Sequence, residues 1–179
     1  EPYRGCHTFI RAIPELQRQH PEARIVVVGR TKGVSYGAVC PDGEWGDRFL
    51  AEIEGQYDPS RVHFTGSLPY SQFIPLLQLS ACHVYLTYPF VMSWSLLEAM
   101  GCGCAVVGSD TGPVREVIHH GKNGVLVDFF SPSDLAAAVV EMLNAPERAA
   151  AFGVAARETV ERTYDLKTCV SRQLALMDL

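Results

Sequence analysis

A helix and a strand follow each other closely in the stretch SLLEAMGCGCAVVG, which covers residues 95–108. Residues 95–101 predict a helix that ends at Gly101, because glycine commonly terminates helices. The apolar run at residues 105–108 then predicts a short strand. A helix followed by a strand of this kind is the repeating unit of α/β proteins.

Outward from this stretch, predicted strands and helices alternate along the whole chain. Residues 24–29 are a continuous, mostly β-branched run that predicts a buried parallel strand. The remaining strands are expected at 62–66, 81–86, 105–108 and 124–127, and the helices at 6–19, 45–57, 71–80, 95–101, 114–119, 132–143, 146–163 and 166–177. This alternation predicts an α/β fold, a Rossmann-like parallel sheet with helices on both faces, in a single domain spanning residues 1–179.

Composition and charge exclude several function classes. The formal net charge is −5 and no cluster of Lys and Arg stands out, which argues against a nucleic-acid partner. No apolar stretch reaches the roughly 20 residues that a transmembrane helix needs. Among the six cysteines only Cys102 and Cys104 are close, and no further ligands complete a zinc set. We therefore expect no metal and a reducing, cytoplasmic location.

Ligands of such sheets bind where the carboxyl ends of the strands lead into loops. The loop after residue 86 enters the predicted helix at 95–101, and a helix N-terminus attracts anions through its free N–H groups and its dipole. Ser93 and Ser95 are small enough to let a phosphate approach, and Glu98 could accept two hydroxyl protons from a ribose. The alternative, that Glu98 is only an acid favoured near a helix start, stays open at this point.

Several motifs, taken in order, resemble the C-terminal domain of the retaining GT-B glycosyltransferases of group 1, also called glycosyltransferase family 4. They lie at residues 95–103, 105–118 and 121–127, and earlier at 1–5 and 62–66. The resemblance implies the C-terminal half of a GT-B fold. It also implies an enzyme of polysaccharide biosynthesis that transfers a hexose-type sugar from a sugar nucleotide to a glycan or another acceptor.

The resemblance further implies roles for individual residues. Glu98 matches the second acid of the family's E-x7-E motif, which holds the donor ribose. Arg4 lies where the family places a cation on the donor diphosphate, and its guanidinium offers a bidentate fork. Backbone groups near residues 67–68 match those that meet the base, and those near 93–95 match those that face the diphosphate. The expected donor-binding residues are Arg4, Ser67, Leu68, Ser93, Trp94, Ser95 and Glu98.

One position departs from the family pattern. The first acid of E-x7-E would fall at residue 90, and this chain has Phe90 there. Since that acid lies near the donor sugar in the family, no residue of this chain is assigned a catalytic role. Fixed amides and cations can stabilise a developing diphosphate charge without a metal, and the chain has no D-x-D pair. We therefore expect no cofactor besides the donor substrate.

The resemblance covers only half of a GT-B enzyme. It implies that an acceptor-side N-terminal domain precedes residue 1, and that the first strand of the C-terminal half, just upstream of residues 4–5, is missing. We therefore expect a sheet with a missing neighbour, a rearranged edge or a strand borrowed from another chain. The chain alone should bind donor weakly and transfer no sugar. Its last helix, at 166–177, should expose an apolar face that could pack in a homo-oligomer, and the missing domain could contact the inner membrane.

Other functions remain as alternatives. A dinucleotide-dependent oxidoreductase would carry G-x-G-x-x-G after its first strand, and the sequence after Gly29 does not supply it. A GT-B-type sugar-nucleotide epimerase is a closer alternative. A non-catalytic domain that binds a nucleotide sugar or acts as a scaffold is the third, motivated by Phe90.

Overall fold

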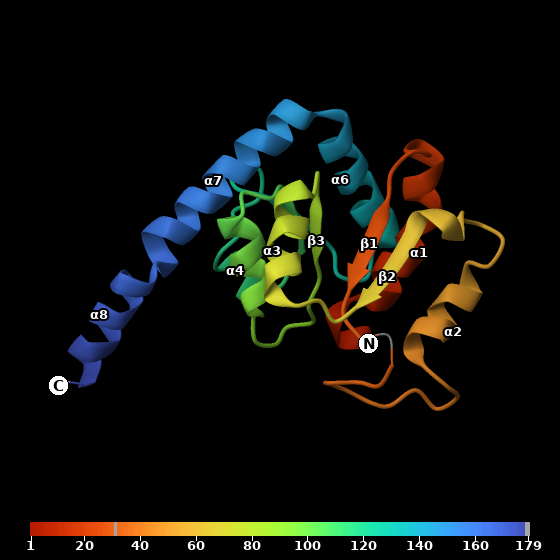
Figure 1. The fold of residues 1–179 in the computed structure, drawn as a ribbon, viewed down its shortest axis with the longest axis horizontal. Helices are drawn as coiled ribbons and strands as arrows, with labels where there is room; N and C mark the ends of the chain where they lie inside the picture. The colour runs from red at the N-terminus through yellow and green to blue at the C-terminus, as the bar shows by residue number, and fades with distance from the viewer. Residues whose placement is uncertain (31, 178–179) are drawn as a thin grey trace.

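The computed structural model of the chain describes residues 1–30 and 32–177, in which helices and strands alternate as predicted (Figure 1). The strands are β1 (Ile25–Val28), β2 (Val62–Gly66), β3 (His83–Tyr85), β4 (Val106–Ser109) and β5 (Val125–Val127). The helices are η1 (Pro2–Arg4), α1 (Cys6–Gln19), α2 (Trp45–Glu52), η2 (Pro59–Arg61), α3 (Tyr70–Leu79), α4 (Trp94–Gly101), α5 (Gly112–Arg115), α6 (Pro132–Asn144), α7 (Pro146–Tyr164) and α8 (Leu166–Met177).

Strand β4 is the centre of the fold. It pairs in parallel with β3 on one side and with β5 on the other, and all four of its residues are buried. Val107 packs into a cluster with residues of α1 and α6, whereas Val106 packs into a second cluster with residues of α4 and α7. The prediction of helices on both faces is therefore confirmed for this sheet, and burial of each such valine contributes about 1.5–3 kcal/mol.

Strands β1 and β2 form a separate parallel pair. In the described part of the chain β1 is hydrogen-bonded only to β2, and β3 only to β4, so the five strands do not form one continuous sheet. The expectation of a sheet with a missing neighbour is confirmed. The prediction that residues 24–29 form a buried strand is wrong for one face, because Val26 and Val28 are 39% and 37% exposed. Only the side of Ile25 is buried, in the cluster that contains α1 and α2, and a β-branched run does not tell how many faces are covered.

Two helix boundaries differ from the sequence prediction. Helix α2 ends at Glu52 and not at residue 57, and Gly55 follows in a left-handed conformation (φ 72°) that helices do not continue through. Helix α5 spans Gly112–Arg115, whereas residues 114–119 were predicted. It begins earlier because Pro113 lies in its first turn, where proline is favoured. The segment after it is held by Asn123, whose side chain accepts from the His119 amide and donates to the Val117 carbonyl.

Helices α7 and α8 lie on the outside of the three-stranded sheet. Helix α7 packs against α4, and α8 continues away from the body of the protein (Figure 1). Leu166, Leu174 and Met177 on α8 are exposed, as expected for that helix. No helix among the described residues is long and apolar enough to cross a membrane.

The contact between α7 and the end of α4 depends on a glycine. A Cβ atom at Gly153 of α7 would lie 2.1 Å from the carbonyl oxygen of Gly103 and 3.0 Å from its carbonyl carbon. Both atoms belong to backbone, so neither can rotate away as a side chain could. Gly103 itself has φ 78° and turns the chain from α4 into β4.

We predict that Gly153→Ala destabilises the protein by about 1–3 kcal/mol, the usual range for an overpacked core. Alanine favours a helix by about 1 kcal/mol over glycine, so the clash must exceed this gain. Urea unfolding would measure the change in the free energy of unfolding. Gly112→Ala is the matched control, since a Cβ there meets nothing within 4 Å. Equal stability of the two variants would contradict the packing described.

Candidate functional site

The loops that follow the strands gather at one edge of the molecule. Strands β1 and β2 both point toward the lower edge in Figure 1, where the N-terminal residues, the connection from β1 to α2 and the loop between β3 and α4 also lie. This is the carboxyl edge, where the strand order of an open α/β sheet places ligands.

Arg4 is placed beside the loop between β3 and α4 by the backbone of its neighbours. The Tyr88 amide donates to the Tyr3 carbonyl at 2.9 Å. Gly5 has φ 68°, and a Cβ atom there would lie 2.3 Å from the Cβ of Leu86. The glycine thus lets η1 lie directly against the end of β3. As a result Arg4, although more than 80 residues earlier in the chain, lies at the loop that leads into α4.

The Arg4 guanidinium has an unpaired N–H group. Its Nη1 atom is buried and has no hydrogen-bond partner in the structure. No carboxylate among the described residues lies within salt-bridge distance of Arg4, whereas Arg11 and Arg115 are paired with Glu52 and Asp110. A buried donor without a partner is unfavourable by about 1–3 kcal/mol. An anion bound at this position would supply the missing acceptor.

The start of α4 offers one free amide. The Ser93 amide donates to the Tyr85 hydroxyl at 2.8 Å, and the Ser95 amide points to the Ser93 hydroxyl at 3.4 Å. The Trp94 amide has no partner within the described residues, and the Trp94 side chain is 81% exposed. The helix therefore presents the Trp94 amide and its dipole to a ligand, while Ser93 caps the helix.

Glu98 lies on α4 beyond the first turn. Its half-buried carboxylate makes no hydrogen bond or ion pair with any residue that the structure describes. The dipole of a helix acts on charges within the first turn, which contains no acidic residue in α4. The structure thus gives no support to the alternative that Glu98 is an acid favoured by the helix start. Its carboxylate is left free to accept hydrogen bonds.

Ser67 and Leu68 follow β2 at the same edge. Gly66 turns the chain there with φ 67°, Ser67 is exposed and Leu68 is half-buried. No hydrogen bond connects either residue to Arg4 or to α4 within the described chain. The structure therefore brings Arg4 beside the loop that leads into α4, through the contacts of Tyr3 with Tyr88 and of Tyr36 with Arg4 and Phe90.

A buried serine at the end of β4 is bonded to the loop after β3. Sequence reasoning did not identify this serine. The Ser109 hydroxyl accepts from the Thr87 amide and donates to the Thr87 carbonyl, both at 3.0 Å. Ser109 and Thr87 are 0% and 1% exposed. The only sequence signal was a hydroxyl at the end of an apolar strand. This pair fixes where the chain leaves β3 on its way to the start of α4.

Aromatic side chains occupy the position of the missing acid. The rings of Phe90 and Tyr36 lie 5.0 Å apart, and the Tyr36 ring lies 5.1 Å from the guanidinium carbon of Arg4. Tyr3 and Tyr88 form a second pair at 5.4 Å. All four rings are between 42% and 45% exposed. Sequence reasoning did not identify Tyr3 or Tyr88, because contacts between distant loops leave no periodic signal.

The two neighbouring cysteines, Cys102 and Cys104, lie at the end of α4 and just before β4. Burial raises the pKa of Cys104 to about 12, and its thiol donates to the Leu77 carbonyl at 3.1 Å. Burial also raises the pKa of Cys102. Both shifts favour the protonated thiol, and in this form a buried cysteine behaves as a small apolar side chain. The described residues contain no group of three or more His, Cys, Asp and Glu side chains arranged to hold a metal ion.

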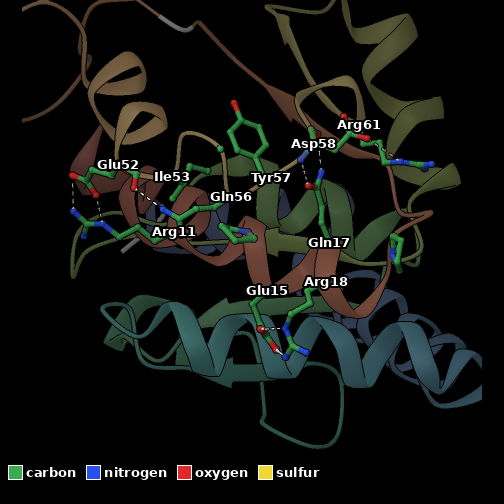
Figure 2. Close-up of a pocket in the computed structure, with 13 residues that line it drawn as sticks. Arg11, Glu15, Gln17, Arg18, Glu52, Ile53, Gln56, Tyr57, Asp58 and Arg61 are labelled. Carbon is green, nitrogen blue, oxygen red and sulfur yellow. Dashed lines mark hydrogen bonds and ion pairs between the residues drawn. The ribbon is translucent and has the colours of Figure 1, made fainter.

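A groove of about 1030 Å³ lies elsewhere, between α1 and the segment from α2 to η2 (Figure 2). Its charged side chains pair with one another, as Arg11 does with Glu52 and Arg18 with Glu15. The segment at 53–61 leads into the amino end of β2, so the groove lies away from the carboxyl edge. With its charges neutralised and its position off that edge, the groove is a weaker candidate than the site at Arg4.

Residues 1–159 match the family described as "Glycosyl transferases group 1". The chain belongs to this family. It is 27% identical, over 98% of its length, to a GDP-mannose-dependent α-(1-6)-phosphatidylinositol monomannoside mannosyltransferase of Mycolicibacterium smegmatis, 45% of which is covered. It is 26% identical, over 94% of its length, to an uncharacterized glycosyltransferase of Methanocaldococcus jannaschii, 40% of which is covered. The chain thus spans less than half the length of these relatives.

Solved structures confirm the predicted fold. Sucrose-phosphate synthase from Thermosynechococcus elongatus superimposes with a TM-score of 0.84 at 21% identity, over 99% of this chain and 42% of that protein. Anabaena HepE in complex with UDP superimposes with a TM-score of 0.78 at 22% identity, over 100% of this chain and 46% of that protein. The C-terminal domain of a group 1 glycosyltransferase from Francisella tularensis superimposes with a TM-score of 0.76 at 20% identity, over 93% of this chain and 82% of that domain. The chain has the fold of the C-terminal half of a GT-B glycosyltransferase.

We predict that Ser109→Ala lowers the free energy of unfolding by about 1–3 kcal/mol, because it leaves the buried amide and carbonyl of Thr87 unpaired. Ser171→Ala, at an exposed position of α8, is the control and should change stability by less than about 0.5 kcal/mol. Thermal or urea unfolding would measure both. A Ser109 variant as stable as the control would show that the serine does not hold this loop.

Proposed function

We propose that this chain binds the sugar-nucleotide donor of a retaining glycosyltransferase that transfers a hexose-type sugar to a glycan or another acceptor. The observation that carries the proposal is the unpaired, buried N–H of Arg4 beside the loop that leads into α4, the helix whose first amide, at Trp94, is also free. Family membership supports the reaction class. The UDP complex of the Anabaena protein and the GDP-mannose dependence named for the mycobacterial relative support a nucleotide sugar as ligand.

Each element of this site has a distinct chemical task. As the bond between sugar and diphosphate loosens, negative charge accumulates on the diphosphate oxygens. The Arg4 guanidinium and the positive end of the α4 dipole lie where they stabilise that charge, and such fixed dipoles need no reorganisation during the reaction. Glu98 accepts hydrogen bonds from the ribose hydroxyls. Backbone groups of Ser67 and Leu68 contact the base.

The proposal includes neither a metal nor another cofactor, since Arg4 and the helix N-terminus supply positive charge. The acceptor would be held by a domain outside residues 1–179, so the isolated chain would bind donor weakly and transfer no sugar. We place the protein in the cytoplasm, where its six free cysteines stay reduced, with any contact to the membrane surface made by that other domain.

A second candidate is a domain that binds the nucleotide sugar without catalysing transfer. It is favoured by Phe90, whose ring packs on Tyr36 where the family pattern has a carboxylate. The two candidates share the same donor site and differ in the reaction that follows. Incubating the full-length protein with donor and acceptor separates them, because only an enzyme releases the nucleoside diphosphate with transfer of the sugar.

We predict that Arg4→Gln and Glu98→Gln weaken binding in different ways. Arg4→Gln should lower the affinity for UDP about tenfold or more, because hydrogen bonds to charged groups contribute about 1.5–3 kcal/mol. The affinity for uridine, which has no phosphate, should not change. Glu98→Gln should lower the affinity for both UDP and uridine, because both ligands carry the ribose. Isothermal titration of the full-length protein with UDP, GDP, ADP and the matching nucleosides would measure these effects and identify the base.

Ser171→Ala serves as the control and should bind every ligand as the parent protein does. If Arg4→Gln weakens uridine as strongly as UDP, Arg4 does not contact the diphosphate. If none of the nucleotides binds the parent protein, the proposed function is wrong.

A further inference from the structure

One loop lies across the cation of the proposed donor site. The loop at residues 32–44 carries Tyr36 onto the Arg4 guanidinium, at 5.1 Å, and onto the ring of Phe90, at 5.0 Å. Gly37, with φ 89°, lets this loop approach η1, because a Cβ atom there would lie 2.8 Å from the Tyr3 ring. Three separate segments, η1, this loop and the loop before α4, thus meet around Arg4.

The loop is attached by bonds that can open without unfolding the core. The Glu1 carboxylate accepts from the amides of Ser35 and Tyr36, at 2.5 and 3.2 Å. The Trp45 indole N–H of α2 donates to the Ala38 carbonyl at 2.9 Å. All three bonds are exposed, so water can replace them. In the described part of the loop only Cys40 is buried, and it belongs to neither hydrophobic cluster.

The Arg4 Nη1 atom is enclosed in this arrangement. It has no hydrogen-bond partner and no solvent contact, and the Tyr36 ring lies over the guanidinium. An anion can therefore reach Nη1 only after the enclosing groups move. The Tyr36 ring lies against the guanidinium, and the segment that carries it is attached by exposed hydrogen bonds. The closed loop and a bound diphosphate thus compete for the same cation.

We propose that Tyr36 is a gate on the donor site, closed over Arg4 in the free protein and displaced when the diphosphate of a nucleotide binds. This inference rests on the proposed function. Phe90 is the latch, since its ring holds Tyr36 in the closed position. A ligand that binds only the open state has its affinity reduced by the fraction of open molecules. Residue 90, where the family resemblance leads one to expect an acid, instead controls access to Arg4.

The test is isothermal titration of the full-length protein with UDP, for Tyr36→Ala, Phe90→Ala, the double variant and Tyr70→Ala. Each single variant opens the gate and should bind UDP about three- to tenfold more tightly, where tenfold corresponds to about 1.4 kcal/mol. The double variant should bind no more tightly than the better single variant, because both changes remove one closed state. Tyr70→Ala, an exposed tyrosine of α3, should match the parent protein.

A second measurement needs no ligand. Phe90→Ala should speed hydrogen exchange of the Ser35 and Tyr36 amides about tenfold without changing exchange of the β4 core. Unchanged exchange overturns the latch, and unchanged or weaker UDP binding by Tyr36→Ala overturns the gate while leaving the proposed function standing. Failure of UDP, GDP and ADP alike to bind the parent protein and all variants contradicts the proposed function itself, and the gate with it.

Discussion

The proposed donor site depends on one backbone contact between distant parts of the chain. The Tyr88 amide donates to the Tyr3 carbonyl, and Gly5 lies so close to Leu86 that no side chain would fit between them. This contact fixes η1 against the end of β3, and the position of Arg4 follows from it. Without it, the only unpaired buried guanidinium N–H in the described chain would have no fixed relation to the start of α4.

The frame that supports this contact is the three-stranded sheet around β4. Strand β4 is buried on both faces, and Ser109 at its end is hydrogen-bonded to the backbone of Thr87. These bonds fix Thr87, the second residue after β3, to the sheet. The loop that follows β3 therefore leaves a fixed point before it reaches Phe90 and α4. By contrast, the loop at 32–44 follows β1, which has one exposed face and one bonded neighbour. The proposed site thus combines the loop after β3, which is anchored to the buried sheet, with the loop at 32–44, which is attached by exposed bonds.

Much of the fold could be predicted from the sequence, because its signals are local. Residues 95–108 predicted α4 and β4, and the helix expected at 132–143 is α6, whose first turn is capped by the Ser131 hydroxyl, which accepts from the Asp134 amide. The exposure of Val26 and Val28 could not be predicted, since it depends on which face the helices cover. The same holds for the pairing of Tyr36 with Phe90 and Arg4. Such contacts between loops follow from tertiary structure and leave no pattern along the chain.

Family resemblance identified Arg4 and Glu98, and the structure adds that each has polar atoms without a partner among the described residues. Arg4 has an unpaired buried N–H, and the Glu98 carboxylate has no partner among the described residues. The central claim is that these groups hold the donor nucleotide. A crystal structure of the full-length protein with UDP tests it most directly. The account predicts diphosphate oxygens within hydrogen-bond distance of the Arg4 guanidinium and the Trp94 amide, with the ribose on Glu98. A nucleotide bound instead in the groove beside Arg11 and Arg18 would contradict it.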